Sequence, residues 1–219
     1  MSTTQLNPDD FIITRKRKKY KFALFANSPI CFELEQWQKR PIDALELGAG
    51  TGLFCVELAA RHPGKTFVAV DVKADRLQKG ASVATERGLS NIYFVRARAD
   101  QLSDVVPEKS VESLWLTFAD PFPKKRSAGR RMTHPHYLKL YEKLLKPGGA
   151  FYVKHDNRDF FQWSLEQLVA EKWRIDELSF DLHESDLPDE YKIQTTYERR
   201  WLGEGLVTSF VRAFPKSVK

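Results

Sequence analysis

From Pro41 onward the chain alternates between short apolar runs and amphipathic stretches. Short apolar runs bounded by turn residues predict buried strands, and apolar residues repeating every three or four positions predict helices. The predicted strands are 42–47, 66–70, 92–96, 111–118, 150–155, 173–182 and 207–214. The predicted helices are 53–61, 74–87, 135–146 and 160–171. Strands and helices that alternate in this way are typical of a parallel sheet with helices on both faces.

The last two predicted strands have no helix-like segment between them. We therefore expect them to pair antiparallel through the long polar loop at 181–205. The predicted fold class is α/β, with a mostly parallel, seven-stranded, doubly wound sheet that carries an antiparallel C-terminal strand.

The N-terminal part has a different pattern. Residues 1–13 are polar, and residues 15–21 are almost continuously basic. Ser28-Pro29 predicts the start of a short helix that runs to Gln38, because proline suits the first helical position. We expect residues 1–21 to be a flexible basic N-terminal arm and residues 22–219 to be a single domain.

Composition excludes several classes of protein. A chain of 219 residues with 42% hydrophobic and 29% charged residues is typical of one globular domain. No apolar run has membrane-spanning length, so neither secretion nor membrane insertion is expected. Cys31 and Cys55 lie in apolar contexts and are expected to be small core residues in a reducing, cytoplasmic compartment. The five histidines are scattered and predict no metal site.

Charge is concentrated in two segments. Residues 15–21 carry six positive charges and residues 124–131 carry five, within a net charge of +6. Without these eleven, 24 basic residues stand against 29 acidic ones, so the rest of the protein is mildly acidic. Two concentrated basic segments indicate a polyanionic partner, although a basic tail alone can also be a nonspecific arm.

A glycine-rich loop follows the first predicted strand. Gly48, Gly50 and Gly52 allow a tight turn and close approach of a ligand to the backbone. Glu46 would repel a pyrophosphate but suits a cation, and S-adenosylmethionine offers an ammonium and a sulfonium without phosphate. Asp71, after the next strand, suits ribose hydroxyls. Asp100, after the third strand, can accept a hydrogen bond from the adenine amine.

The fourth strand runs into Asp120-Pro121-Phe122-Pro123 and then into the second basic segment. The two prolines remove backbone donors and fix φ, which predicts a rigid turn. The turn would hold the Asp120 carboxylate and the Phe122 ring where open α/β sheets bind ligands. On its own the segment is compatible with two interpretations to an equal degree: a ligand-binding turn, or an ordinary turn followed by a solvated basic loop.

Three motifs together carry a specific resemblance: Asp-Pro-Phe-Pro-Lys-Lys-Arg at 120–126, Lys-His-Asp-Asn-Arg at 154–158, and Thr-Thr-Tyr-Glu at 195–198. From about residue 41 to the C-terminus the chain resembles the tRNA (guanine-N7)-methyltransferases. The resemblance implies a Rossmann-like class I methyltransferase fold. It also implies S-adenosylmethionine as cofactor, tRNA as partner, and methylation of the variable-loop guanosine at tRNA position 46.

The resemblance also implies roles for individual residues. Asp120 is the implied catalytic residue and, with Glu46, Asp71 and Asp100, a cofactor-site acid. The implied guanosine-site residues are Lys124, Asp156, Thr195, Thr196, Tyr197 and Glu198. The implied RNA-contacting residues are Arg126, Arg130 and Arg131. Phe122 stands where the family usually has tryptophan, which keeps a stacking face and loses the indole donor.

Two other hypotheses remain open from the sequence. A small-molecule or protein methyltransferase of the same fold would leave both basic segments without a role. An RNA-binding subunit without turnover would not need the acids at positions 46, 71 and 120. The sequence leaves the oligomeric state, monomer or homodimer, undecided.

Overall fold

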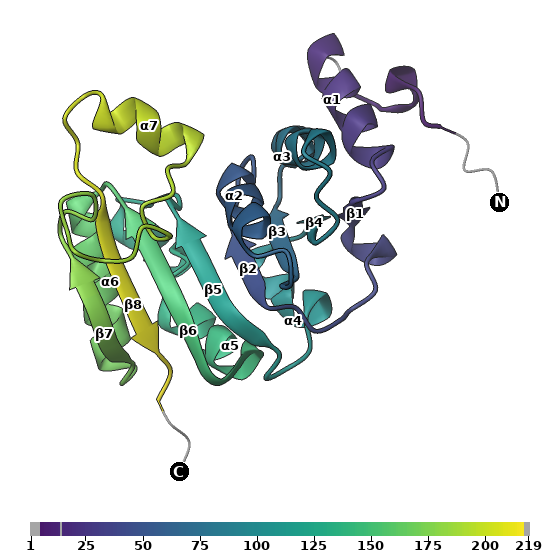
Figure 1. Ribbon diagram of the computed structural model, residues 1–219. Helices are drawn as coiled ribbons and strands as arrows, with labels where there is room; N and C mark the ends of the chain where they lie inside the picture. Colours follow the sequence, from purple (N-terminus) through teal and green to yellow (C-terminus); the bar gives the residue numbers. More distant parts are fainter. Residues whose placement is uncertain (1–4, 14, 217–219) are drawn as a thin grey trace.

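The computed structural model describes residues 5–13 and 15–216. Within them, eight strands form one sheet in the order β1-β4-β3-β2-β5-β6-β8-β7 (Figure 1). The strands are β1 (Cys31–Glu33), β2 (Ala44–Leu47), β3 (Phe67–Asp71), β4 (Ile92–Arg96), β5 (Val111–Thr117), β6 (Leu145–His155), β7 (Arg174–Ser179) and β8 (Ser209–Phe214). The pairs from β1 to β6 are parallel, and β8 is antiparallel to both β6 and β7.

Helices cover both faces of the sheet. The α-helices are α1 (Lys16–Ala26), α2 (Leu53–Arg61), α3 (Ala74–Glu86), α4 (Leu102–Val105), α5 (Pro135–Leu144), α6 (Arg158–Ala170) and α7 (Thr196–Leu202). The 3-10 turns are η1 (Pro8–Asp10), η2 (Leu34–Gln36), η3 (Ala99–Gln101) and η4 (Lys125–Arg130). The mostly parallel sheet with an antiparallel C-terminal strand confirms the predicted fold class.

Two apolar clusters lie on opposite faces of the sheet. One packs β-strand side chains against α4, α5 and α6, and the other packs them against α1, α2 and α3. On the second face, Phe54 of α2 reaches Trp115 of β5, and another part of the chain covers β6 and β8. There the loop before α7 supplies Leu182, Tyr191 and Ile193 to the cluster. The loop therefore belongs to the core as well as to the end of the sheet where α7 lies (Figure 1).

The structure corrects the predicted helix at 28–38. Cys31–Glu33 is strand β1, which pairs in parallel with Phe94–Arg96 of β4 at the sheet edge and brings the strand number to eight. Leu34–Gln36 is only a 3-10 turn. Pairing with β4, which is distant in sequence, decides the conformation of these residues over their local preference.

The structure also corrects the predicted arm. Helix α1 begins at Lys16, runs through the predicted boundary at residue 21, and packs against α3. Its Phe25 is 1% exposed, so the apolar side of the helix belongs to the core. Leu6 exchanges two hydrogen bonds with the Asn27 side chain, of 2.9 and 2.8 Å, which hold residues before the helix against its end. Residues 1–4 and 14 of the predicted arm lie outside the described residues.

Candidate active site

The glycine loop has one packed side and one open side. Gly52 adopts φ +69°, and a Cβ at this position would lie 2.7 Å from the Phe94 ring. Helix α3 approaches the loop so closely that a Cβ at Gly80 would lie 2.1 Å from the Thr51 carbonyl oxygen. A Cβ at Gly50, by contrast, would meet nothing within 4 Å. The loop is thus packed against Phe94 and α3 on one side, and its backbone is accessible near Gly50 on the other.

Asp71 helps to fix this loop. One carboxylate oxygen accepts a hydrogen bond of 2.8 Å from the Gly50 N–H, and the other accepts one of 2.8 Å from the Lys73 N–H. Asp100 lies in η3 after β4, where it pairs with the Arg98 guanidinium. Both acids therefore follow consecutive strands at the carboxyl end of the sheet, as predicted, although both already have partners in the protein.

Glu46 is placed differently from the other acids. Its side chain is 2% exposed and lies under the start of α2. It accepts hydrogen bonds from the Thr117 hydroxyl, at 2.7 Å, and from the Cys55 N–H, at 3.1 Å. Burial raises the pKa of Glu46 to about 7, against the opposing effect of these two donors. A direct contact between Glu46 and the cofactor ammonium stays a prediction, since the carboxylate is buried under α2.

The Asp120 turn is strained and braced. Phe118 and Phe122, on either side of Asp120, have φ values of 51° and 42°, a region that side chains other than glycine rarely adopt. The Arg131 guanidinium donates hydrogen bonds to the Pro121 and Phe122 carbonyls, each at 3.1 Å. Asp120 itself is exposed. The turn therefore presents the carboxylate to solvent at the end of β5, on a backbone that its neighbours hold in a costly conformation.

His155, at the end of β6, braces the same turn from the other side. Its Nδ1 accepts a hydrogen bond from the Asn157 N–H, at 2.8 Å, and its Nε2 lies 2.8 Å from the Ala119 carbonyl. A carbonyl can only accept, so Nε2 carries a ring hydrogen and donates it to Ala119. Sequence analysis did not single out His155, whose role depends on contact with a residue 36 positions away.

The second basic segment divides into two groups. Lys124, Arg126 and Arg130 are exposed, and the Arg130 guanidinium stacks 4.2 Å from the Phe122 ring centroid. Arg131 is half-buried, since it binds the turn carbonyls and stacks 4.5 Å from the Trp163 ring. The exposed cations, which include Lys125, can meet phosphates, whereas the Arg131 side chain is occupied within the protein.

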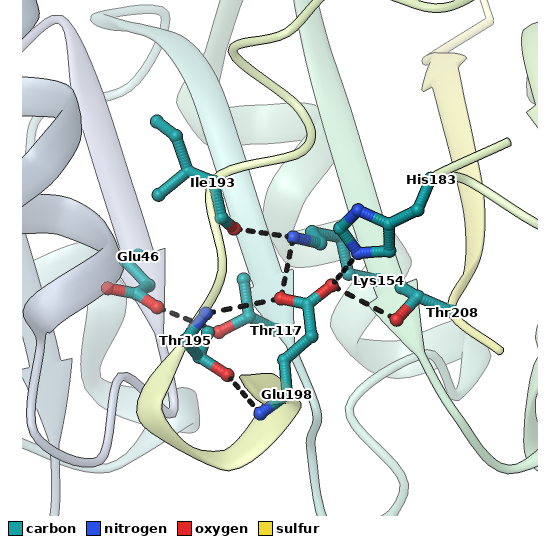
Figure 2. Close-up of polar contacts among 8 residues, drawn as sticks. All are labelled: Glu46, Thr117, Lys154, His183, Ile193, Thr195, Glu198 and Thr208. Carbon is teal, nitrogen blue, oxygen red and sulfur yellow. Dashed lines mark hydrogen bonds and ion pairs between the residues drawn. The ribbon is translucent and has the colours of Figure 1, made fainter. Parts of the chain in front are cut away.

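The Thr195–Glu198 motif is a capping box at the start of α7. The Thr195 hydroxyl accepts a hydrogen bond of 3.0 Å from the Glu198 N–H, and the Glu198 carboxylate accepts one of 3.1 Å from the Thr195 N–H. Glu198 is 1% exposed and forms an ion pair of 2.9 Å with Lys154, which is 0% exposed (Figure 2). Burial opposes the charge on Glu198, but hydrogen bonds from His183 and Lys154 hold its pKa below the usual range. The Thr196 side chain lies outside the described residues.

Tyr197 points toward the Asp120 side of the site. Its hydroxyl donates a hydrogen bond of 3.4 Å to Asp156, and its ring lies 5.6 Å from the Phe118 ring. The Tyr197 side chain is 47% exposed. The structure therefore brings Asp156, Tyr197 and the Asp120 turn together, while Glu198 points the other way into the core.

Comparison with known proteins agrees with this geometry. The model of a family described as "Putative methyltransferase" matches residues 40–209. A tRNA (guanine-N(7)-)-methyltransferase of Brevibacillus brevis is 32% identical over 190 residues, which are 84% of this chain and 87% of the relative. A Staphylococcus saprophyticus protein with the same name is 37% identical over 161 residues, 74% of this chain and 75% of the relative. The chain belongs to the tRNA (guanine-N7)-methyltransferase family.

Solved structures confirm the class I methyltransferase fold of this family member. The 16S rRNA methyltransferase KamB superposes with a TM-score of 0.60 at 16% identity, over 83% of this chain and 90% of that chain. The 16S rRNA (adenine(1408)-N(1))-methyltransferase from Catenulisporales acidiphilia gives 0.57 at 15% identity, over 100% and 97%. Among the described residues, no helix is long and apolar enough to cross a membrane, and no cluster of acidic, histidine or cysteine side chains could hold a metal ion.

Besides His155, sequence analysis of this family member missed Lys154, His183 and Thr208, which surround the Glu198 carboxylate. Lys154 offered a signal, because a lysine inside the apolar run of a central strand is buried and needs a partner. The Thr-x-x-Glu spacing at 195–198 also predicts a capping box. His183 and Thr208 gave no signal, since only the folded chain brings them to Glu198.

Proposed function

We propose that this protein transfers the methyl group of S-adenosylmethionine to N7 of a guanosine in tRNA, at position 46 of the variable loop. The observation that carries the proposal is the Asp120 turn. It stands at the carboxyl end of β5, beside β2 and its glycine loop, and leads directly into the exposed cations of η4. Family membership supports the same chemistry, since the curated relatives are named for it.

The described residues fit the cofactor. The open side of the glycine loop at Gly50 lets a ligand approach the backbone, and Gly48 and Gly52 have the positive φ values that this turn requires. Asp71 and Asp100 keep lone pairs for ribose hydroxyls and the adenine amine, because a carboxylate can accept about four hydrogen bonds. When bound, S-adenosylmethionine supplies an electrophilic methyl group on a sulfonium. Glu46 supports the cofactor loop indirectly, because its carboxylate accepts a hydrogen bond from the Cys55 N–H and so fixes the start of α2.

The reaction at guanine N7 needs alignment more than proton transfer. N7 carries a lone pair and no proton, so no general base has to create the nucleophile. Asp120 holds a polar edge of the base or cofactor, and Asp156 accepts from the guanine N1–H or 2-amino group, donors that adenine lacks at these positions. The Tyr197 and Phe122 rings offer stacking faces. Placing N7 in line with the methyl group, about 3 Å away, is the main contribution to rate.

The exposed cations bind the RNA backbone. Lys124, Arg126 and Arg130 leave the strand end next to Asp120, so they meet phosphates close to the target guanosine. Lys18, Lys19 and Lys21 of α1 add a more distant electrostatic contribution. We propose the cytoplasm as the location, because it holds the tRNA and because both cysteines are buried and free.

Methyl transfer from labelled S-adenosylmethionine to bulk tRNA, followed by identification of the nucleosides, tests the proposal. We expect the label in 7-methylguanosine, and its loss from a purified tRNA in which adenosine replaces guanosine 46. Label on another atom or another position would overturn the proposal. Salt-dependent tRNA binding without label would favour a non-catalytic RNA-binding subunit, and label on small molecules or proteins alone would favour the other methyltransferase classes.

A further inference from the structure

A buried polar cluster lies under α7, at the end of β6. It consists of Lys154, Glu198 and Thr208, which are buried, and of His183 and Thr195. Figure 2 shows the Lys154, His183 and Thr208 side chains and the Thr195 N–H converging on the Glu198 carboxylate. Lys154 is on β6 and Thr208 precedes β8, whereas His183 and Thr195 come from the loop between β7 and α7. One carboxylate thus joins the sheet to both ends of the segment 183–208.

The Glu198 carboxylate is fully used within the protein. Its Oε2 accepts from Lys154 Nζ, at 2.9 Å, and from the Thr195 N–H, at 3.1 Å. Its Oε1 accepts from His183 Nε2, at 2.8 Å, and from the Thr208 hydroxyl, at 3.0 Å. A carboxylate has about four acceptor positions, and these four donors occupy them. The side chain is also 1% exposed, so it has neither a free lone pair nor an open path to a base.

Lys154 binds the same segment at a second point. Its ammonium donates a hydrogen bond of 2.7 Å to the Ile193 carbonyl, two residues before the capping box. Ile193 itself is buried and belongs to the same apolar cluster as Trp115 and Phe210. The chain that enters α7 is therefore held at Ile193 and at Glu198, and Tyr197 lies directly between the capping residue Thr195 and the anchored Glu198.

We propose that Lys154 and Glu198 are positioning residues, which hold Tyr197 against Asp156 and Phe118 without touching the substrate. The inference rests on the proposed function and refines it, because it assigns base recognition to Asp156 and Tyr197 and removes Glu198 from the residues that contact guanosine. Lys154 acts through Glu198, and Glu198 acts through the start of α7. His183 and Thr208 donate the two remaining hydrogen bonds to the Glu198 carboxylate and orient it.

The test compares total rate with base discrimination. The variants are Lys154→Met, Glu198→Gln and Thr208→Val, assayed on tRNA that carries guanosine or inosine at the target position. Inosine keeps the ring N–H and lacks the exocyclic amine. A misplaced Tyr197 slows both substrates alike, and a displacement of about 1 Å can cost about a hundredfold in rate. We therefore expect kcat to fall at least about tenfold in the first two variants, with an unchanged guanosine-to-inosine ratio.

Matched controls separate this effect from a general loss of stability. Lys146→Met, on the same strand, removes an exposed ion pair of 2.9 Å with Glu112 at the opposite end of β6, and we expect wild-type kcat. Amide hydrogen exchange of residues 195–202 should rise in Lys154→Met and Glu198→Gln and not in Lys146→Met. Thr208→Val removes only one of the four donors, so it should remain folded and show a smaller fall in kcat.

Three results would overturn the inference. One is a guanosine-to-inosine ratio that falls toward one in Glu198→Gln, which would show that Glu198 contacts the base. Another is wild-type kcat in Lys154→Met. The third is unchanged hydrogen exchange at 195–202 in both variants. A wild-type protein that methylates neither tRNA would instead overturn the proposed function, so the two failures are distinguishable.

Discussion

The Arg131 guanidinium donates hydrogen bonds to the Phe122 carbonyl, at 3.1 and 3.3 Å, and so supports a residue whose φ is 42°. The neighbouring Arg130 stacks on the Phe122 ring instead. Two adjacent arginines of one basic segment therefore have different tasks. Arg131 holds the backbone of the Asp120 turn, and Arg130, like Arg126, is exposed, where we propose that it binds RNA.

Arg131→Gln and Arg126→Gln should separate these tasks. Loss of the Arg131 contacts loosens the turn, so we expect kcat to fall about tenfold or more while the salt dependence of tRNA binding stays the same. Loss of Arg126 removes a phosphate contact, so the slope of log affinity against log salt should flatten by roughly 0.7–0.9 with a smaller effect on kcat. Steady-state kinetics and binding at several salt concentrations measure both. Equal slopes and equal kcat losses in the two variants would contradict the division.

Asp120→Ala tests the carboxylate that the turn presents. Because Asp120 is exposed, the variant should unfold at nearly the same urea concentration as the wild type. Methyl transfer should nevertheless fall by about a hundredfold or more, since the reacting groups lose their anchor. Single-turnover assays with saturating cofactor measure the effect. A rate within a few-fold of wild type would make Asp120 a turn residue without a catalytic role.

Most strands and helices from residue 42 onward could be predicted because they are encoded locally. The short helices α4 and α7 are exceptions, and α7 lies within the segment 181–205 that was predicted to be a loop. β2 is a continuous run of four buried residues, and α3 and α5 show the helical apolar repeat. β1 could not be predicted, since its three residues become a strand only through pairing with β4. The same holds for α1, where basic side chains conceal an apolar face that packs on α3.

The sequence predicts where the site residues lie along the chain, but not which partners their side chains contact. Asp71, Asp100 and Asp120 follow predicted strands, and the topology of a parallel sheet places them at one end. Which side chains turn inward is decided by contacts between distant residues. Lys154 and Glu198 are 44 positions apart and Thr117 and Glu46 are 71 apart, so no local pattern could reveal which residues pair with the two glutamates.

Neutralising the lysines of α1 should affect tRNA affinity more than chemistry. The helix packs on α3 near β1 at the edge of the sheet, and β4, β3 and β2 lie between β1 and β5 (Figure 1). The triple variant Lys18→Gln, Lys19→Gln, Lys21→Gln keeps Phe25 in the core, whereas deletion of residues 1–21 would cut the helix. We expect a raised KM for tRNA and a kcat within about twofold of wild type, the behaviour of uniform binding. Steady-state kinetics on tRNA at two salt concentrations would check both values, and a large loss of kcat would mean that α1 contributes to the active site.

Glu46 should make stability depend on pH. Burial raises the pKa of Glu46 from 4.5 to about 7, so the folded protein binds a proton that the unfolded chain releases between these values. Stability from this group is therefore fully present below about pH 4.5 and is lost as the pH rises to about 7. The loss is on the order of 3 kcal/mol in the free energy of unfolding. Urea unfolding at pH 5 and pH 8 measures it.

Glu46→Gln should remove this pH dependence without disturbing the contacts. The amide oxygen can still accept from the Cys55 N–H, and the amide nitrogen can donate to the Thr117 hydroxyl, which is able to accept. Relative to wild type, the variant should gain stability as the pH rises from 5 to 8. Glu57→Gln, which removes a surface pair with Arg87, should leave the wild-type slope in place. An identical slope in Glu46→Gln and wild type would mean that Glu46 is ionised throughout this range, with its charge stabilised by the donors under α2 and by Lys154.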